Sequence, residues 1–123
     1  MFEQDPYVSL RTFRKSGAAV DTPVWCAHVD DNIYIFSAGE AGKVKRLRNS
    51  NQAEMAKCDA RGKLLGDWVT AQAELIDDPN EVSKAQTAFR QKYGWQIKLA
   101  DWGAKLTGRF NKRAYIRVNL TQT

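Results

Sequence analysis

The residues in this sequence best suited to chemistry are a group of cations that follows a small, glycine-containing loop. Periodicity predicts a helix beginning near Lys43, because Val44 and Leu47 are spaced to share one face. Backbone N–H groups at a helix start, with cationic side chains beside them, suit a phosphate group. The segment therefore predicts an anion site, with a solvated basic surface as the alternative. Its members are the loop Gly39–Gly42 and the side chains of Lys43, Lys45, Arg46 and Arg48.

This loop differs from the P-loop of nucleotide-hydrolysing proteins. That motif has four residues between its glycines, and a Ser or Thr after its lysine to hold magnesium. Here only two residues separate Gly39 from Gly42, and Val44 follows Lys43. The segment is therefore no P-loop, and phosphate binding without nucleotide hydrolysis remains.

Other residue types offer little for catalysis. His28 is the only histidine in the chain, whereas metal sites and Ser-His-Asp or Cys-His arrangements need further partners. The carboxylate pairs Asp30-Asp31 and Asp77-Asp78 are better explained by turn and helix-cap chemistry. We therefore expect no metal site and assign no catalytic residue.

Length and composition favour one folded, mildly basic domain over residues 1–123. The chain holds 19 Lys and Arg against 14 Asp and Glu, for a net charge of +5, and it has no Gly-, Ser- or Pro-rich linker. An aromatic content of 11%, with four Trp, is too high for a disordered basic tail. The basic residues are interleaved with acids and form no known nucleic-acid motif, so nucleic-acid binding is the least favoured alternative.

The sequence also predicts a cytoplasmic protein. The first residues lack the basic patch and apolar run of a signal peptide, and no apolar stretch is long enough for a membrane span. Cys26 and Cys58 lie far apart and form no CxxC motif, which indicates reduced thiols.

Alternation of apolar residues predicts six strands, with turns at Ser16-Gly17, Asp30-Asp31 and Asp59–Gly62. Pro23 cannot donate to a strand ladder, so the second strand should lie at a sheet edge or bend there. The strands are predicted over Tyr7–Phe13, Ala19–Val29, Ile33–Phe36, Gln52–Cys58, Trp68–Ile76 and Ala114–Leu120.

A clear helix signal lies between the last two strands. Asp78 can cap, Pro79 suits the first turn, and Gly94 ends the pattern. A further helix is expected over about Gln96–Phe110. Helices that do not alternate with strands argue against a parallel βαβ sheet and favour a mainly β (α+β) fold, a small barrel or sandwich with attached helices. The predicted buried face of the first helix comprises Val82, Ala85, Phe89 and Tyr93.

Three segments in this order and spacing resemble a known family. They are TPVW at Thr22–Trp25, GKVKRLR at Gly42–Arg48 and CDARG at Cys58–Gly62. The chain is similar over nearly its whole length to flavin- or deazaflavin-dependent oxidoreductases of the pyridoxamine 5′-phosphate oxidase-like FMN-binding split-barrel superfamily. Within it, the closest group is the short coenzyme F-420-dependent oxidoreductases. This resemblance implies a six-stranded antiparallel split β-barrel and a homodimer with the cofactor at the subunit interface.

The resemblance also implies hydride transfer between a bound coenzyme F-420 (8-hydroxy-5-deazaflavin), or FMN, and a small unsaturated substrate. The cofactor would supply the chemistry, which agrees with the missing acid–base pair. Implied cofactor-binding residues are Thr22, Pro23, Val24 and Trp25 along the ring, Phe36, Ser37 and Ala38 near the ring-to-ribityl region, Lys43, Lys45 and Arg46 at the phosphate, and Arg61 as a further contributor.

Two alternatives to a specific cofactor and activity stay open. True pyridoxamine phosphate oxidases end in an arginine-containing substrate motif, which the closing residues Val118–Thr123 lack, and this argues against oxidation of pyridoxamine phosphate. The extra cations Lys15, Lys45 and Arg48 would accompany the anionic tail of the deazaflavin, which favours it modestly over FMN. A non-catalytic flavin- or haem-binding carrier on the same barrel is the alternative function.

Overall fold

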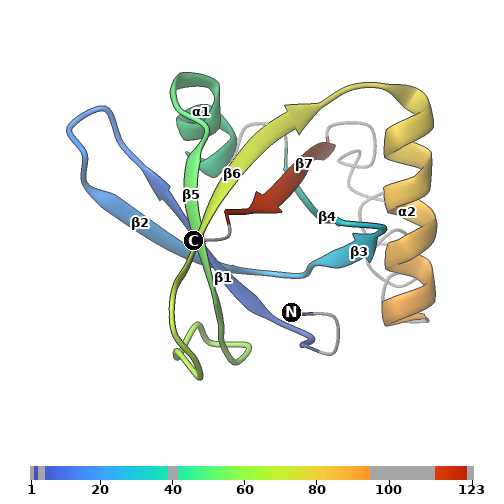
Figure 1. Cartoon of the computed structure of the whole chain (residues 1–123), viewed down its shortest axis with the longest axis horizontal. Coiled ribbons are helices and arrows are strands. Elements are labelled where there is room, and N and C mark those ends of the chain that lie inside the picture. Colours follow the sequence, from blue (N-terminus) through green and yellow to red (C-terminus); the bar gives the residue numbers. More distant parts are fainter. Residues whose placement is uncertain (1, 3–4, 39–41, 95–112, 122–123) are drawn as a thin grey trace.

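The computed structural model describes residues 2, 5–38, 42–94 and 113–121. It contains one antiparallel sheet of seven strands in the order β2-β1-β5-β6-β7-β4-β3, and two helices (Figure 1). The elements are β1 Val8–Phe13, β2 Ala19–Val24, β3 Ala27–Val29, β4 Asn32–Ala38, α1 Gly42–Asn49, β5 Gln52–Lys57, β6 Val69–Ile76, α2 Pro79–Tyr93 and β7 Arg113–Leu120.

The chain connectivity explains why this sheet curls into a half-barrel. β2 and β3 are the two edge strands of the sheet, with five other strands between them. In the chain, however, only Trp25 and Cys26 separate them. So short a link can join opposite edges only if the sheet bends round until those edges approach each other. The fold is therefore the mainly β split barrel that the sequence predicts.

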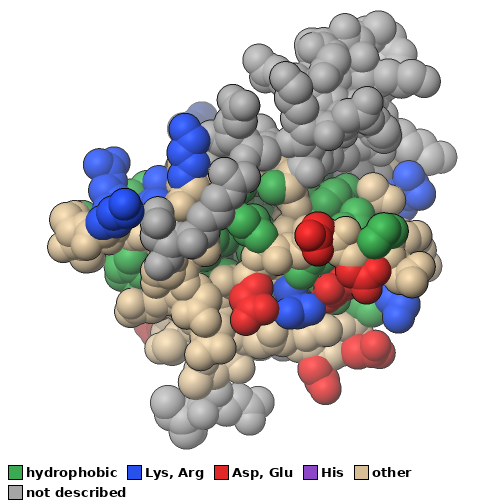
Figure 2. All heavy atoms as spheres, turned by 90° about the horizontal axis from the view of Figure 1, so that it is seen from above, with side chains coloured by type: hydrophobic (Ala, Val, Ile, Leu, Met, Phe, Trp, Pro, Cys, Tyr) green, Lys and Arg blue, Asp and Glu red, His purple; other side chains and the backbone are tan. Residues whose placement is uncertain are grey.

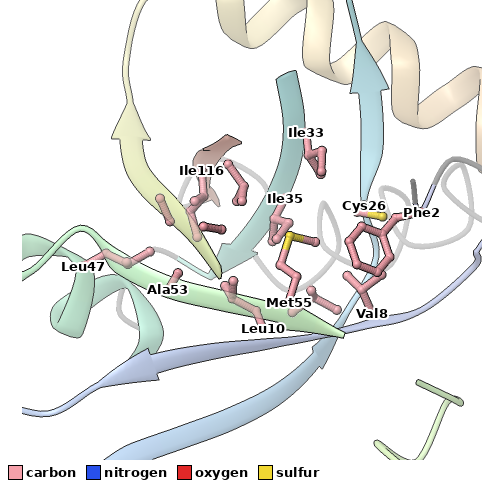
Figure 3. Packing of buried hydrophobic residues seen from close by; sticks show 14 residues of the cluster. Phe2, Val8, Leu10, Cys26, Ile33, Ile35, Leu47, Ala53, Met55 and Ile116 are labelled. Atoms are coloured by element: carbon pink, nitrogen blue, oxygen red, sulfur yellow. The ribbon is translucent and has the colours of Figure 1, made fainter. Parts of the chain in front are cut away.

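The interior of the barrel is filled by alternate residues of its strands (Figure 3). Val8 and Leu10 of β1, Ile35 of β4 and Ile116 of β7 are fully buried, as is Met55 of β5. Because side chains alternate across a strand, the intervening residues point to the outer face. A small barrel filled in this way leaves its interior to side chains, so a flat ligand has to bind outside it.

Helix α1 packs against β1 and β6 and closes part of the inner side of the sheet. Val44 is fully buried and Leu47 is 7% exposed, which confirms their predicted shared face. Of its cations, Lys45 is exposed, whereas Lys43 and Arg46 are half-buried. The Arg46 guanidinium reaches Thr12, so α1 presents this cation beside β1.

Helix α2 covers the outer face of β3, β4 and β7 (Figure 1). As predicted, the Asp78 carboxylate caps it by accepting from the Asn80 N–H at 3.1 Å, and Gly94 ends it at a φ of +56°. Its buried residues Ala85, Phe89 and Tyr93 form a second, aromatic core with the outer-face residues of the sheet. We call this group the aromatic cluster: Trp25, Tyr34, Phe36, Phe89, Tyr93 and Tyr115, with the small apolar residues between them.

The structure corrects the predicted strand count from six to seven. The predicted strand Ala19–Val29 is two strands, because the chain leaves the ladder of β2 after Val24 and pairs again only with β4 from Ala27. The edge position predicted for Pro23 is confirmed. The other predicted strands are present with slightly different ends. The helix predicted over Gln96–Phe110 lies outside the described residues.

Candidate functional site

A cationic site lies at the start of α1. The Arg46 Nε donates to the Oγ1 of the fully buried Thr12 on β1, at 2.5 Å. The guanidinium folds back over the first helical turn, so that a Cβ added to Gly42 would lie 2.7 Å from Arg46 Nη1. Helix side chains lean toward the N-terminus, which brings residue i+4 over residue i. Because Gly42 has no side chain, the Arg46 guanidinium can occupy the space beside it.

Burial and like charge both disfavour the charged forms of the cations at this site. Burial lowers the pKa of the half-buried Lys43, and repulsion from Arg46 lowers it further. Burial also lowers the pKa of Arg46, with repulsion from Arg14 as the second cause. Among the described residues, neither Lys43 nor Arg46 forms an ion pair with a carboxylate. In the described part of the chain the two charges have no carboxylate counterion, and an anion here would relieve both repulsions.

The cationic site continues toward the β1–β2 hairpin. A groove of about 490 Å³ lies there, between the hairpin and the start of β5, and Arg14 and Lys15 line it together with Ser50 and Gln52. Figure 2 shows Lys and Arg side chains gathered at this end of the molecule. Lys45 is exposed on α1. The arrangement provides positive charge over a distance longer than one phosphate group.

Edge strand β2 lies beside this site and supplies the first predicted ring residues. Thr22 and Val24 pair in register with Leu10 and Val8 of β1, so their side chains point to the inner face. Val24 is buried, whereas Thr22 is half-buried because no strand flanks it on its outer side. Pro23 points to the opposite face and is exposed.

Arg61 lies near the other end of β2, in the turn that follows β5. Its backbone N–H donates to the Asp59 carboxylate at 2.9 Å, which fixes the turn, and its side chain is exposed. The next residue, Gly62, has a φ of +91°, and a Cβ there would lie 3.8 Å from Pro23 Cδ. Arg61 is thus adjacent to the predicted ring wall at Pro23.

The remaining predicted ring residues divide between the two faces of the sheet. Trp25 and Phe36 belong to the aromatic cluster, with ring centroids 6.3 Å apart in an edge-to-face arrangement. Ser37 is buried on the inner face, and Ala38 is the last residue of β4. The structure therefore brings together Lys43 with Arg46, Pro23 with the turn of Arg61, and Trp25 with Phe36, as three separate groups.

Sequence reasoning did not assign three residues that the structure places in or beside these groups. Thr12 holds Arg46, Arg14 adds to its positive surroundings, and Tyr93 stacks on Trp25 with centroids 4.5 Å apart. Thr12 is two residues from the apolar Leu10 on a predicted strand, so the two side chains share a face. The inward direction of Thr12 could therefore have been inferred. Nothing in the spacing of Tyr93 indicates that it meets Trp25.

The other residues that the sequence singled out lie elsewhere. His28 is half-buried on β3 and lines a groove beside α2. Cys26 and Cys58 are buried and not joined by a disulfide. Within the described part of the chain, no three His, Cys, Asp or Glu side chains lie close enough together to hold a metal ion. In the same residues, no helix is long and apolar enough to cross a membrane.

Comparison with known proteins identifies the fold. No protein-family profile and no curated sequence matches the chain. Among solved structures it is similar to a candidate pyridoxamine 5′-phosphate oxidase from Listeria innocua, with 13% identity, a TM-score of 0.65, and 98% of this chain and 88% of that one covered. A FAD-binding protein from Mesorhizobium loti matches with 16% identity, a TM-score of 0.67 and coverages of 98% and 83%.

HutZ, the haem storage protein from Vibrio cholerae, matches with 10% identity, a TM-score of 0.71 and coverages of 98% and 84%. At identities this low, what these proteins share with the chain is the arrangement of their elements. The likeness spans almost the whole chain in each case. The chain therefore has the split-barrel fold of the pyridoxamine 5′-phosphate oxidase-like proteins.

Proposed function

We propose that this protein is an oxidoreductase that transfers a hydride between a bound flavin-type cofactor and a small, flat, unsaturated substrate. One observation carries the proposal: Lys43 and Arg46 are desolvated cations without a carboxylate partner among the described residues, and they lie next to the half-exposed edge strand β2. An anionic group beside a flat apolar surface describes a phosphate-bearing aromatic cofactor.

In this proposal, Lys43 and Arg46 hold the cofactor phosphate. The Thr12 hydroxyl fixes the Arg46 guanidinium, and the first-turn N–H groups of α1 complete the site. Lys45, on the exposed side of the same helix, and Arg61, beside Pro23, are further contributors. The residues present therefore fit a phosphate group.

The ring of the cofactor would lie along Thr22, Pro23, Val24 and Trp25, with Phe36, Ser37 and Ala38 near the ribityl chain. When bound, such a ring supplies the hydride chemistry. The chain contributes binding and orientation: the half-buried Thr22 side chain and the edge backbone of β2 offer polar contacts, and the exposed Pro23 offers apolar surface. No acid–base pair is required of the protein, since solvent can provide the proton.

We propose coenzyme F-420 as the cofactor, with FMN as the alternative. The groove beside Arg14 and Lys15 continues the positive charge beyond the first phosphate. FMN ends at one phosphate, whereas the deazaflavin continues into an anionic tail that this groove suits. The excess of cations is thus better matched to the longer cofactor.

We further propose that the active form is a cytoplasmic homodimer with the cofactor at the subunit interface. The half-exposed inner side of β2 supports this proposal, because an edge strand with a partly open apolar face needs a covering partner. A second subunit would also complete the substrate side of the groove. The substrate is expected to be a small molecule.

A carrier that binds haem or flavin without catalysis is the second candidate. The similarity to the haem storage protein HutZ favours it, with a TM-score of 0.71. It predicts tight cofactor binding and no turnover with any electron acceptor. The two candidates therefore differ in turnover and in the identity of the bound chromophore.

The direct test is titration of the purified protein with coenzyme F-420, FMN and haem, followed by turnover assays with the bound form. We expect micromolar or tighter binding of the deazaflavin or FMN. Absence of binding to both would reject the oxidoreductase proposal. Tight binding of haem alone would favour the carrier.

Lys43→Ala tests the phosphate site within this titration. The variant should weaken cofactor binding by about 1–3 kcal/mol, the range for a lost charge-assisted hydrogen bond. Lys84→Ala, an exposed residue of α2, is the matched control and should bind as the wild type does. Equal affinity of the Lys43→Ala variant and the wild type would reject Lys43 as a phosphate ligand.

The pH dependence of binding gives a second readout for Lys43. Its pKa in the folded protein is below the usual 10.5 because of burial and Arg46. The anion binds the charged lysine, so affinity should fall as the pH rises through this lowered pKa. Without ligand the sign is opposite: stability rises with pH between the folded pKa and 10.5, because the unfolded chain then binds more protons. Both slopes should be absent in Lys43→Ala.

A further inference from the structure

The hydroxyl of Tyr93, at the end of α2, meets the backbone of the short link between edge strands β2 and β3. It accepts a hydrogen bond from the Cys26 N–H at 3.0 Å. It also lies 2.9 Å from the Pro6 carbonyl oxygen and 3.0 Å from the Cys26 carbonyl oxygen. Tyr93 is 7% exposed, so these contacts are shielded from water. The Tyr93 side chain thus connects α2 to Pro6, which precedes β1, and to Cys26 in the link between β2 and β3.

Lys92 completes the hydrogen bonding of this junction. A tyrosine hydroxyl has one proton to donate, but two carbonyl oxygens lie within its reach. The Lys92 Nζ donates to the Cys26 carbonyl at 2.7 Å, so the Tyr93 proton is left for Pro6. Burial, and the proximity of Cys26, raise the pKa of Tyr93. The hydroxyl therefore stays protonated and keeps its role as a donor.

The ring of Tyr93 holds the other residue of the link. Trp25 stacks on it with centroids 4.5 Å apart and planes 12° apart. Trp25 and Cys26 belong to no strand, so no ladder fixes their backbone. A buried backbone group without a ladder partner needs another partner. Tyr93 and Lys92 provide those partners for Cys26, and stacking fixes Trp25.

From these contacts we infer that Tyr93 and Lys92 are positioning residues for the cofactor ring. They fix the bend at Trp25-Cys26, and with it the direction of β2, which carries the proposed ring-binding residues Thr22 and Pro23. Neither touches the cofactor phosphate site, since both lie on α2, on the opposite face of the sheet from α1. The inference rests on the proposed function, because it assigns these residues a role only if Thr22–Trp25 bind a ring.

Tyr93→Phe tests the inference, since it removes the hydroxyl and keeps the stacking ring. Two measurements are made on the full chain: amide hydrogen exchange at Cys26 without ligand, and titration with coenzyme F-420 and with FMN followed by visible circular dichroism. We expect exchange at Cys26 to become at least about tenfold faster, because the N–H loses its acceptor. The dissociation constant should rise about tenfold, with an altered dichroism of the bound ring.

Tyr34→Phe is the matched control. It also deletes a tyrosine hydroxyl packed under α2, one that donates at 2.7 Å to Glu81, in the first turn of the helix that ends at Tyr93. It should lower stability without changing exchange at Cys26, the affinity or the dichroism. Lys92→Met should act in the same direction as Tyr93→Phe and more weakly, because one carbonyl loses its donor while the amide keeps its acceptor.

The outcomes separate this inference from the proposed function. If the wild type binds neither cofactor, the proposed function fails and the positioning role fails with it. If the wild type binds and Tyr93→Phe binds with the same affinity and dichroism, the positioning role alone is overturned. If Tyr34→Phe changes affinity and dichroism as much as Tyr93→Phe does, the effect is general loosening under α2, which also overturns it.

Discussion

Arg46 and Arg117 are both half-buried guanidinium groups, but their surroundings are opposite. On β7, Arg117 lies 2.8 Å from the Glu81 carboxylate and 3.0 Å from that of Glu74. Its pKa is raised, chiefly by the hydrogen bond to Glu81. The pKa of Arg46 on α1 is lowered by burial and by Arg14, and Thr12 offers it only a neutral oxygen. Figure 2 shows the same contrast, with acidic side chains around a Lys or Arg side chain in the middle of the view and several Lys and Arg side chains at the hairpin end.

This difference separates charge that is paired within the fold from charge that, in our proposal, binds a ligand. Around α2, Arg117 is paired with carboxylates of the same chain, and the rings of the aromatic cluster pack against one another. At α1, the folded protein keeps Lys43 and Arg46 together, and neither pairs with a carboxylate among the described residues. Removing a side chain at the α2 end should therefore lower stability, whereas changes at the α1 end should alter binding with little effect on stability.

Phe89→Ala should have the largest effect on stability. Phe89 is 1% exposed at the centre of the aromatic cluster, and the ring of Phe36 meets it edge-on with centroids 4.8 Å apart. Truncation leaves a cavity, so the free energy of unfolding should fall by about 3–5 kcal/mol. Urea denaturation measures this, with Gln91→Ala on the exposed face of α2 as the control. A loss below about 1 kcal/mol would contradict the assigned packing.

Glu81→Gln should lower stability by about 1.5–3 kcal/mol at neutral pH, without changing cofactor affinity. Burial would raise the pKa of Glu81, but hydrogen bonds from Tyr34 and Arg117 lower it below the usual 4.5. Its stabilising effect is therefore present above pH 4.5 and lost as the pH falls through the lowered pKa.

Denaturation of wild type and Glu81→Gln across pH 2–7 tests this sign. The two curves should differ at pH 7 and converge in acid. Glu54→Gln, which removes the longer 3.3 Å contact with Arg11, is the comparison and should cost less. A difference that persists unchanged to the lowest pH would show that Glu81 acts by packing rather than by charge.

The sequence predicted the α2 end more completely than the α1 end, and the reason is the range of the interactions. The limits and buried face of α2 follow from Asp78, Pro79 and Gly94, which act within a few residues. Where Ala19–Val29 divides into two strands, the Cys26 N–H donates to Tyr93, which is 67 residues away in the chain. No local pattern carries that information.

The cationic site shows the same limit. The presence of Lys43 and Arg46 at a helix start could be predicted from spacing. Their burial, and the hydrogen bond from Arg46 to Thr12, could not be predicted from spacing, because both depend on how α1 packs against β1. Whether Trp25 and Phe36 touch a cofactor ring stays a prediction, because both also serve the aromatic cluster.

Gly42→Ala should give the smallest effect on stability and still weaken binding. The new Cβ would lie 2.7 Å from Arg46 Nη1, the far end of a flexible side chain, so the guanidinium must move rather than the backbone. Ala also favours helix over Gly, and the unfolding free energy should therefore change by no more than about 0.5 kcal/mol.

Displacing Arg46 from its position over the first turn should weaken cofactor binding severalfold, since the geometry of the phosphate site is lost. Gly66→Ala is the matched control: its Cβ would meet only Lys57 Cβ, at an ordinary 3.5 Å, and binding should be unchanged. Calorimetric titration of both variants measures the difference. If Gly42→Ala binds as tightly as the wild type, then Arg46 does not act from this position, and the contrast between Arg46 and Arg117 would reflect folding alone.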